Sequence, residues 1–344
     1  MKTAIDLFCG SGAVTWGLKD AGFNVIGAID FDSTACATYR LNHPEVHLVE
    51  QDIKKVTPTI FSQTLDDVHV DLLVVCAPCQ PFSNRNRKKS TDDDRLLLVL
   101  ESLRFIEFLN PTILFFENVP NIGKSSAFYE LEQRLIKLGY YVNPPQCVDA
   151  AELGVPQRRK RMILVGAKRN TLLQSVQDIK PYKKQTVFDA ISDLPSPQIC
   201  TPADDALHFA RRHSALNIRR LQHIPHDGGC RESLPEDLQL SCHKKLAVKT
   251  NSFPDTYGRM KWDDVAPTLT TGCTDITKGR YAHPVQDRAI TLREAARLQT
   301  FPDNYMFEGN SAQIANQIGN AVPPRMMARI AESLFKALSE EKMP

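Results

Sequence analysis

Short apolar runs alternate with helical stretches over residues 1–170, and this alternation constrains the fold more than any other feature of the chain. We predict strands at residues 4–8, 24–30, 46–49, 70–75, 112–116 and 161–167. Residues 95–109 and 126–138 have helical spacing, and Gly139 stands where glycine commonly ends a helix. Strands that alternate with helices predict βαβ units, and therefore an α/β fold with a mostly parallel sheet.

The character of the sequence changes at about Pro181. Prolines, histidines and short polar segments replace the alternation up to about Pro284, which predicts a smaller domain that is irregular or β-rich. Helical spacing returns at residues 291–299 and 325–338, so we expect the C-terminal part to pack back onto the first domain. The predicted boundaries are 1–180 together with 310–344 for the first domain, 181–287 for the smaller domain and 288–309 for a connecting hinge.

The composition is that of an ordinary soluble protein. The 344 residues are 42% hydrophobic and 24% charged, and such a chain can bury a sizeable core. The start of the chain lacks the pattern of a signal peptide, and no apolar run approaches the roughly 20 residues of a membrane span. We therefore expect a cytoplasmic protein without membrane contact. Nine cysteines without regular spacing predict reduced thiols, and a net charge of +2 does not by itself indicate nucleic acid.

A glycine-rich turn follows the first predicted strand. Residues 6–12 are Asp-Leu-Phe-Cys-Gly-Ser-Gly, and such a turn lets backbone N–H groups approach a ligand at a helix N-terminus. Asp30 follows at the end of the second strand, where an acidic residue can bind ribose hydroxyls. Asp52 follows the third strand, where a carboxylate can bind an adenine amino group. Thr15 stands in place of the third glycine of the dinucleotide fingerprint, which disfavours nicotinamide binding.

Residues 76–83, Cys-Ala-Pro-Cys-Gln-Pro-Phe-Ser, follow a central apolar strand. Pro78 and Pro81 fix φ on both sides of Cys79 and end strand pairing. A thiol on a stiff turn at the carboxyl end of a central strand is placed to act as a nucleophile.

Cys76-Ala77-Pro78-Cys79 allows two other interpretations. A dithiol redox motif of the thioredoxin kind should begin a helix, whereas a polar loop follows here. A structural zinc site lacks a second matching cysteine pair.

Two further segments carry charged side chains at predicted strand ends. Glu117 directly follows an apolar strand, where a lone glutamate is usually solvated. Residues 157–161 are Gln-Arg-Arg-Lys-Arg, and in an extended strand Arg159 and Arg161 would share one face. The alternative for this segment is an ordinary basic edge.

Taken together, these segments resemble the DNA (cytosine-5) methyltransferases of bacterial restriction–modification systems. The Pro-Cys-Gln-x-Phe-Ser phrase, the glycine turn, Glu-Asn-Val at 117–119 and Gln-x-Arg-x-Arg at 157–161 match four blocks of that family. Residues 293–298 and 317–324 match two more, and all six follow the family's order. The chain departs from the family at Cys76, where glycine is usual.

The resemblance implies a Rossmann-like domain that binds S-adenosylmethionine, with a smaller target recognition domain. The cofactor residues that it implies are Phe8, Gly10, Gly12, Asp30, Phe31, Asp52, Pro78, Asn320 and Val322. Ordinary core packing is the alternative for Phe8 and Phe31.

The resemblance also implies a mechanism. Cys79 would add to C6 of a cytosine that is flipped out of the duplex. Glu117 would contact N3 of that base, which requires a protonated or proton-sharing carboxyl, so burial should raise its pKa. One of Arg159 and Arg161 would orient Glu117, and the other would contact the base or its phosphate.

The implied partner is double-stranded DNA, bound by a monomer that acts beside a cognate restriction endonuclease. Residues 84–94 should form a mobile loop that closes over the base. The DNA contacts expected on this basis are Gln80, Ser83, Arg85, Arg87, Lys88, Lys89 and Thr268, the last within a Thr-Leu element at residues 266–270.

The same patterns allow other functions. The same fold serves RNA cytosine-5 methyltransferases that act on tRNA, and a non-catalytic DNA-binding regulator could also retain it. A metal site is suggested by several side chains whose spacing fits no standard site, namely His208, His213, His223, His226, Cys230 and His243. The recognised base sequence does not follow from these patterns.

Overall fold

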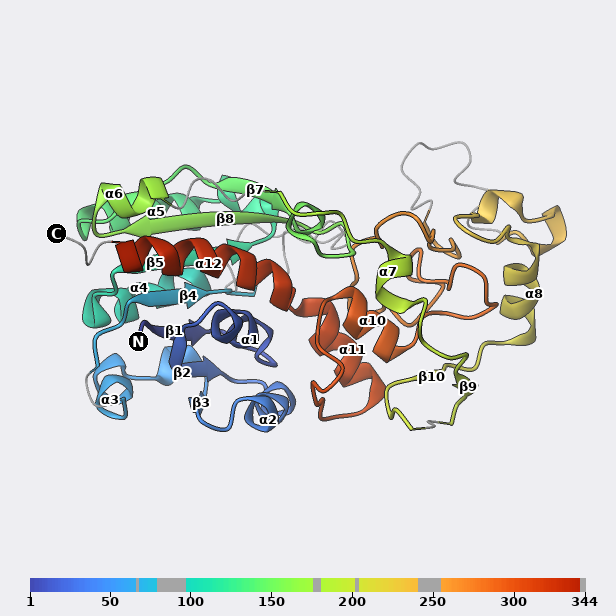
Figure 1. Cartoon of the computed structure of the whole chain (residues 1–344), viewed down its shortest axis with the longest axis horizontal. Helices are drawn as coiled ribbons and strands as arrows, with labels where there is room; N and C mark the ends of the chain where they lie inside the picture. Colours follow the sequence, from blue (N-terminus) through green and yellow to red (C-terminus); the bar gives the residue numbers. More distant parts are fainter. Residues whose placement is uncertain (66–67, 79–96, 176–180, 202–203, 241–254, 341–344) are drawn as a thin grey trace.

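The computed structural model describes residues 1–65, 68–78, 97–175, 181–201, 204–240 and 255–340. Figure 1 shows a sheet with helices on both faces, which we call the large lobe, and a more irregular part beside it. We call this second part, residues 181–201, 204–240 and 255–287, the small lobe.

The sheet of the large lobe is mostly parallel, as predicted. Its strands lie in the order β3-β2-β1-β4-β5-β8-β6, and β7 also pairs with β8. Strands β1 to β5 are parallel to one another, whereas β8 is antiparallel to β5, β6 and β7. The strands are β1 (Thr3–Leu7), β2 (Asn24–Asp30), β3 (His47–Glu50), β4 (Leu72–Val75), β5 (Ile113–Asn118), β6 (Tyr141–Val142), β7 (Gln146–Asp149) and β8 (Lys160–Ala167).

The order of the strands creates a switch point between β1 and β4. From β1 the chain moves outward to β2 and β3, and it then returns to the other side of β1 as β4 and β5. The connections on the two sides therefore diverge, and a crevice is expected outside the carboxyl ends of these two strands. The glycine-rich turn and the turn that leads to Cys79 both follow strands that border this crevice.

Helices cover both faces of the sheet because its side chains alternate between two cores. Along β5, Phe115 belongs to the core under α1, α6 and α12, whereas Leu114 and Phe116 belong to the core under α3, α4 and α5. No helix among the described residues is both long and apolar enough to cross a bilayer. The helices of this lobe are α1 (Ala13–Asp20), α2 (Ser33–Asn42), α3 (Pro58–Gln63), α4 (Leu98–Leu109), α5 (Ser126–Lys137), α6 (Asn170–Ser175) and α12 (Pro324–Glu340), with the 3-10 turns η1 (Ile53–Lys55), η3 (Pro120–Lys124) and η4 (Ala150–Leu153).

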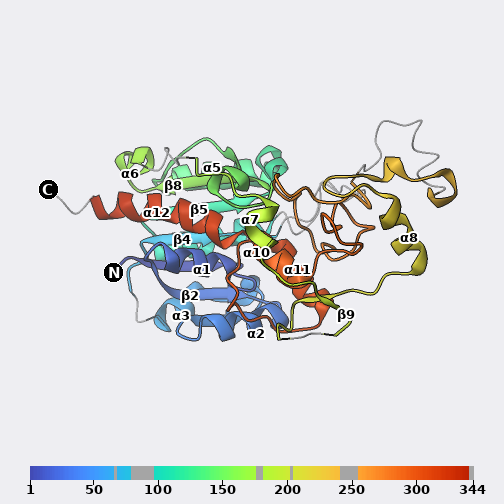
Figure 2. The ribbon, with the colours of Figure 1, turned by 45° about the vertical axis from the view of Figure 1, so that its right-hand side comes forward.

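The C-terminal helix α12 completes the large lobe. Figures 1 and 2 show it along the face of the sheet that α1 also covers, and Met326, Ile330 and Leu334 are buried there. Gly17 of α1 permits the close approach, because a Cβ at this position would lie 2.5 Å from the Pro324 carbonyl oxygen.

The small lobe has little regular structure, which agrees with the predicted irregular domain. Its longest helix, α8, was not predicted. Figures 1 and 2 both show α10 and α11 between the sheet and α8. The elements outside the large lobe are α7 (Val187–Ile191), β9 (Gln198–Ile199), β10 (Phe209–Ala210), α8 (Ala215–His223), η5 (Arg231–Ser233), η6 (Glu236–Leu238), α10 (Leu292–Leu298) and α11 (Ser311–Asn320).

Gly17→Ala is expected to lower the melting temperature by several degrees. The added Cβ would also lie 2.8 Å from Met327 Cβ, so α1 and α12 must move apart. Overpacking of this kind costs about 1–3 kcal/mol, which exceeds the gain in helix propensity of at most about 1 kcal/mol. Calorimetry measures the difference.

Gly123→Ala is the matched control, because its Cβ would meet Met162 Cγ at an ordinary 3.9 Å. Equal melting temperatures for the two variants would contradict the close packing of α1 on α12.

Candidate active site at the carboxyl edge of the sheet

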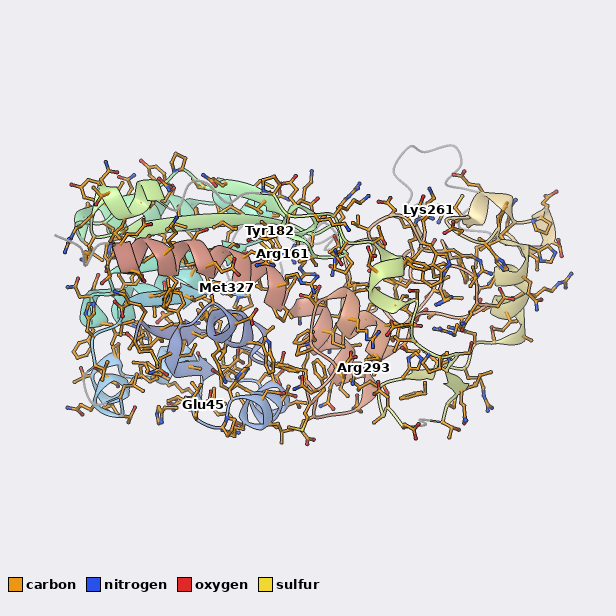
Figure 3. All side chains as sticks on the ribbon, viewed as in Figure 1. Glu45, Arg161, Tyr182, Lys261, Arg293 and Met327 are labelled. Carbon is orange, nitrogen blue, oxygen red and sulfur yellow. The ribbon has the colours of Figure 1, made fainter. Side chains whose placement is uncertain are left out.

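The predicted site residues that the structure describes lie mainly at one edge of the sheet. Parallel strands end at the same edge, and β8, which is antiparallel, begins there. Arg161 lies near the start of β8, on the side of the sheet toward the small lobe (Figure 3). The order of the strands therefore brings the residues that follow β3, β2, β1, β4 and β5 into one row.

The glycine-rich turn after β1 has an unusual backbone. Phe8, Gly10 and Gly12 all have positive φ, at 63°, 52° and 92°, which is a conformation that glycine adopts without strain. The N–H of Gly10 donates to Asp30 Oδ2 at 2.8 Å. A Cβ at Gly10 would meet no atom within 4 Å, so this part of the turn faces open space among the described residues.

Asp30 organises the end of β2 next to this turn. Its Oδ1 accepts from the N–H groups of Phe31 and Asp32, at 2.8 and 3.0 Å. Burial raises the pKa of the Asp30 carboxyl, and these N–H groups and that of Gly10 oppose the shift. The end of β3 lies alongside, because Gln51 N donates to the Asp30 carbonyl at 2.9 Å, and Asp52 follows directly and accepts from Lys54 N at 3.0 Å.

The two aromatic residues of this region differ in burial. Phe31 is 67% exposed, so core packing does not explain it. Phe8 is half-buried and packs against the core under α3, α4 and α5. An exposed phenylalanine beside an acidic strand end is available to a flat, apolar ligand surface.

Asp6 lies beneath the same turn, fully buried in β1. Its Oδ2 accepts from the Thr15 hydroxyl at 2.9 Å, and that hydroxyl also lies 2.9 Å from the Tyr39 hydroxyl. Burial raises the Asp6 pKa to about 7, and its Oδ1 has no hydrogen-bond partner among the described residues.

The turn after β4 is fixed from both sides. Cys76 N donates to the Leu7 carbonyl of β1 at 3.3 Å. On the other side, Asn118 Nδ2 donates to the Ala77 carbonyl at 2.9 Å, while Asn118 Oδ1 accepts from Val119 N at 2.8 Å. Sequence reasoning missed this role of Asn118, and its place beside Glu117 was the only signal.

Cys79 and six predicted DNA contacts lie outside the described residues, namely Gln80, Ser83, Arg85, Arg87, Lys88 and Lys89. The described part ends at Pro78, which is half-buried. The Cys76 thiol faces the core, and burial, followed by the carboxyls of Glu117 and Asp6, raises its pKa well above the usual value. Because dithiol chemistry depends on a thiolate, this environment disfavours the redox interpretation.

Buried Glu117 and half-buried Arg161 form an ion pair at the centre of the edge. Glu117 pairs with Ile163 across β5 and β8, so Arg161, two residues away, projects from the same face. Arg161 Nε lies 2.7 Å from Glu117 Oε1, although the N–H direction leaves that oxygen without a well-aligned hydrogen bond. Glu117 is 7% exposed.

The electrostatic balance at Glu117 is dominated by its burial. Burial raises the pKa of the carboxyl, and the nearby cations Arg161 and Arg159 only partly oppose this shift. The direction is the one that the sequence analysis expected for a carboxyl that holds or shares a proton.

Arg159 lies in a different environment from Arg161. It precedes β8, is 2% exposed, and donates to the carbonyls of Leu269 and Gly319 at 3.0 Å each. Its guanidinium therefore joins the sheet edge to the small lobe and to α11, and its expected contact with the base or phosphate stays a prediction.

The remaining predicted residues lie around this junction. The Thr268 side chain is exposed, and its hydroxyl donates to the Arg158 carbonyl at 2.7 Å. Asn320 is exposed at the end of α11, whereas Val322 is buried in the core that also contains Cys9 and Val14.

The histidines of the small lobe contact the protein itself. The two ring nitrogens of His208 lie 3.0 Å from the Thr291 hydroxyl and 2.7 Å from the Pro195 carbonyl. His213 Nε2 accepts from Ala289 N at 3.2 Å. Within the part of the chain that the structure describes, no group of His, Cys, Asp and Glu has an arrangement suited to a metal ion.

Comparison with known proteins agrees with this geometry. The sequence model of the C-5 cytosine-specific DNA methylase family matches residues 2–336. The Type II methylase M.HgiDII of Herpetosiphon aurantiacus is 38% identical over 343 residues, which cover 97% of this chain and 95% of that protein. The Type II methyltransferase M.Eco47II of Escherichia coli is 33% identical and is matched over 98% of this chain and 80% of that protein.

A solved structure has the same overall fold. The crystal structure of a candidate DNA modification methyltransferase encoded within a prophage (E. coli) superimposes with a TM-score of 0.72 and 26% identity, over 98% of this chain and 100% of that chain. With the family match over nearly the whole sequence, the chain belongs to the C-5 cytosine-specific DNA methylase family, whose members are DNA cytosine-5 methyltransferases.

Proposed function

We propose that the protein transfers a methyl group from S-adenosylmethionine to C5 of a cytosine that is flipped out of a specific double-stranded DNA sequence. The observation that carries this proposal is the pair of buried Glu117 and Arg161 on β5 and β8, next to the turn that leads to Cys79. A carboxyl with a raised pKa beside a candidate thiol nucleophile suits attack on a pyrimidine ring.

The residues at the ends of β1, β2 and β3 suit the adenosine part of S-adenosylmethionine. In support, Gly10 faces open space and Phe31 is exposed. The Asp30 carboxyl accepts from Gly10 N, and the backbone carbonyl of Asp30 accepts from Gln51 N after β3. When bound, S-adenosylmethionine supplies an electrophilic methyl group on a sulfonium. Asn320 ends α11, and Val322 follows it in the core that also contains Cys9. Both residues are proposed as further contacts of the cofactor.

In the proposed reaction the Cys79 thiolate adds to C6 of the cytosine. The electron pair of the C5–C6 double bond shifts toward C4 and N3, and C5 becomes the nucleophilic carbon of an enamine. Glu117 gives N3 a proton or a strong hydrogen bond and so stabilises the developing charge. After C5 has taken the methyl group, a base removes the C5 proton and the thiolate leaves, which restores the double bond.

The neighbours of these groups position them. Arg161 orients the Glu117 carboxyl, and Asn118 fixes the carbonyl two residues before Cys79. A cytosine inside a duplex does not expose C6, so the base must leave the stack. Thr268, and the basic residues of the segment that follows Cys79, are proposed to contact the DNA backbone.

We further propose that the protein acts as a monomer beside a cognate restriction endonuclease. The names of the relatives M.HgiDII and M.Eco47II as Type II enzymes support the pairing with an endonuclease. Transfer of labelled methyl groups to duplex DNA and to tRNA tests the substrate. Methylated tRNA with unmodified DNA would favour the RNA alternative, and DNA binding without any transfer would favour a regulator.

Cys79→Ala should abolish methyl transfer and leave S-adenosylmethionine binding nearly unchanged. The thiol acts only on the base, so its loss removes the nucleophile without changing the cofactor residues. Duplex DNA with 5-fluorocytosine at the target should trap the unsubstituted protein as an adduct stable in denaturing gels, and should not trap the variant.

Cys147→Ala, at an exposed cysteine of β7, is the matched control and should form the adduct normally. An adduct formed equally by Cys79→Ala would remove Cys79 from the mechanism.

Glu117→Gln should lower kcat by about 10²–10⁴-fold, the usual contribution of a general acid or base. Activity that requires protonated Glu117 declines as the pH rises through its raised pKa. The amide does not titrate, so this decline should disappear from the pH profile of the variant.

Glu132→Gln on α5 is the control, because burial also raises the pKa of that carboxyl but it lies away from the edge. An alkaline decline that persists unchanged in Glu117→Gln would assign the titration to another group.

A further inference from the structure

Two side chains from distant parts of the chain bind consecutive carbonyls of the glycine-rich turn. The Tyr305 hydroxyl donates to the Ser11 carbonyl, and His43 Nε2 lies 3.0 Å from the Gly12 carbonyl. His43 is the residue that ends α2, and Tyr305 belongs to the connection between α10 and α11. Neither residue lies in the sequence blocks that carry the family resemblance.

Both side chains are suited to remain hydrogen-bond donors at neutral pH. Burial lowers the His43 pKa to about 4, so the ring is neutral and its single N–H is on the nitrogen that faces the carbonyl. Its Nδ1 is buried without a hydrogen-bond partner among the described residues, which agrees with this tautomer. Burial also raises the pKa of Tyr305, and the phenol keeps its proton.

The rings also fill the space beneath Gly12. A Cβ at Gly12 would lie 2.5 Å from His43 Cδ2 and 3.0 Å from the Tyr305 oxygen, and the φ of Gly12 is 92°. Tyr305 contacts Trp16 edge to face, with ring centroids 5.4 Å apart, and Tyr39 lies 4.8 Å from His43 by the same measure. These four rings form a rigid support on the core side of the turn.

The direction of the carbonyls determines the direction of the N–H groups. In a planar peptide the C=O and the following N–H point in opposite directions. The Gly12 carbonyl accepts from Trp16 N at 2.9 Å and has His43 as its second partner. With the carbonyl held in this way, the N–H of Ala13, a first-turn donor of α1, points away from the His43 ring. Such first-turn N–H groups are the ones that a ligand can use at a helix N-terminus.

We propose that His43 and Tyr305 are positioning residues for the cofactor turn, which they hold in its ligand-ready shape by binding the carbonyls of Gly12 and Ser11. The proposal rests on the proposed S-adenosylmethionine site. It extends that site to two residues that do not touch the ligand and act through the backbone.

Tyr305→Phe tests the proposal because it removes one hydroxyl and keeps the ring. Equilibrium dialysis should give an S-adenosylmethionine Kd roughly 10-fold above that of the unsubstituted protein, because a buried carbonyl loses its donor. KM for S-adenosylmethionine should rise with little change in kcat. His43→Phe should behave similarly, and His43→Gln, which keeps an N–H donor, should recover most of the affinity.

Hydrogen exchange of the protein without cofactor gives an independent measurement. The peptide that contains residues 9–16 should exchange faster in Tyr305→Phe and His43→Phe than in the unsubstituted protein. Tyr129→Phe is the control, because Tyr129 is 64% exposed on α5 and should change neither affinity nor exchange.

Unchanged affinity or unchanged exchange in Tyr305→Phe would overturn the proposal, whatever happens to its melting temperature. The exchange measurement does not use the cofactor. If the unsubstituted protein bound no S-adenosylmethionine, the proposed function would fail, while faster exchange in the variants would still support the role of the two side chains.

Discussion

The buried guanidinium of Arg159 joins the sheet edge to the small lobe, beside the backbone hydrogen bonds of Arg158 N to the Ala266 carbonyl and of Ala266 N to the Pro156 carbonyl. It donates to Leu269 in the small lobe and to Gly319 in α11, and without these carbonyls a buried cation would be costly. Gln157 and Gln299 extend the contact as buried amides that bond to each other. Gly319 permits the approach, because a Cβ there would lie 2.4 Å from the carbonyl carbon of Thr270. The sheet edge and the segment around Thr270 are therefore joined by a network with few alternative arrangements.

Two carboxyls with raised pKa lie on the same face of the sheet and have different neighbours. Asp6 projects from β1 on the side of Ala4, and Glu117 projects from β5 on the side of Phe115. Asp6 accepts from the Thr15 hydroxyl beneath the glycine-rich turn, whereas Glu117 has Arg161 beside it. Both acids lie in a low-dielectric environment, but their neighbours differ. Asp6 is a structural group, and Glu117 is the proposed catalytic group.

The local pattern predicted strands β1 to β5, strand β8 and the α/β class, because these follow from periodicity, but it did not predict the short strands β6 and β7. It missed α8, whose buried face is little more than Arg220 and Leu221 and leaves a weak apolar repeat. The residue types of the site could be predicted from the sequence, but the contacts between these residues could not. Arg159 and Arg161 are chemically identical, and only the pairing of β5 with β8 determines which of them meets Glu117. The contact of Asn118 with the turn before Cys79 likewise depends on strand adjacency, which no local spacing encodes.

The packing of α12 on α1 affects how the protein is made. The core beneath these helices needs Met326, Ile330 and Leu334, which leave the ribosome long after Val14 and Val165. At ordinary synthesis rates this delay is on the order of 10 s. During that interval the nascent chain carries an uncovered apolar sheet face, a surface that chaperones bind. Since the glycine turn is supported from the same late region, the ability to modify DNA should arise only after translation of the last helix, which delays methylation relative to synthesis.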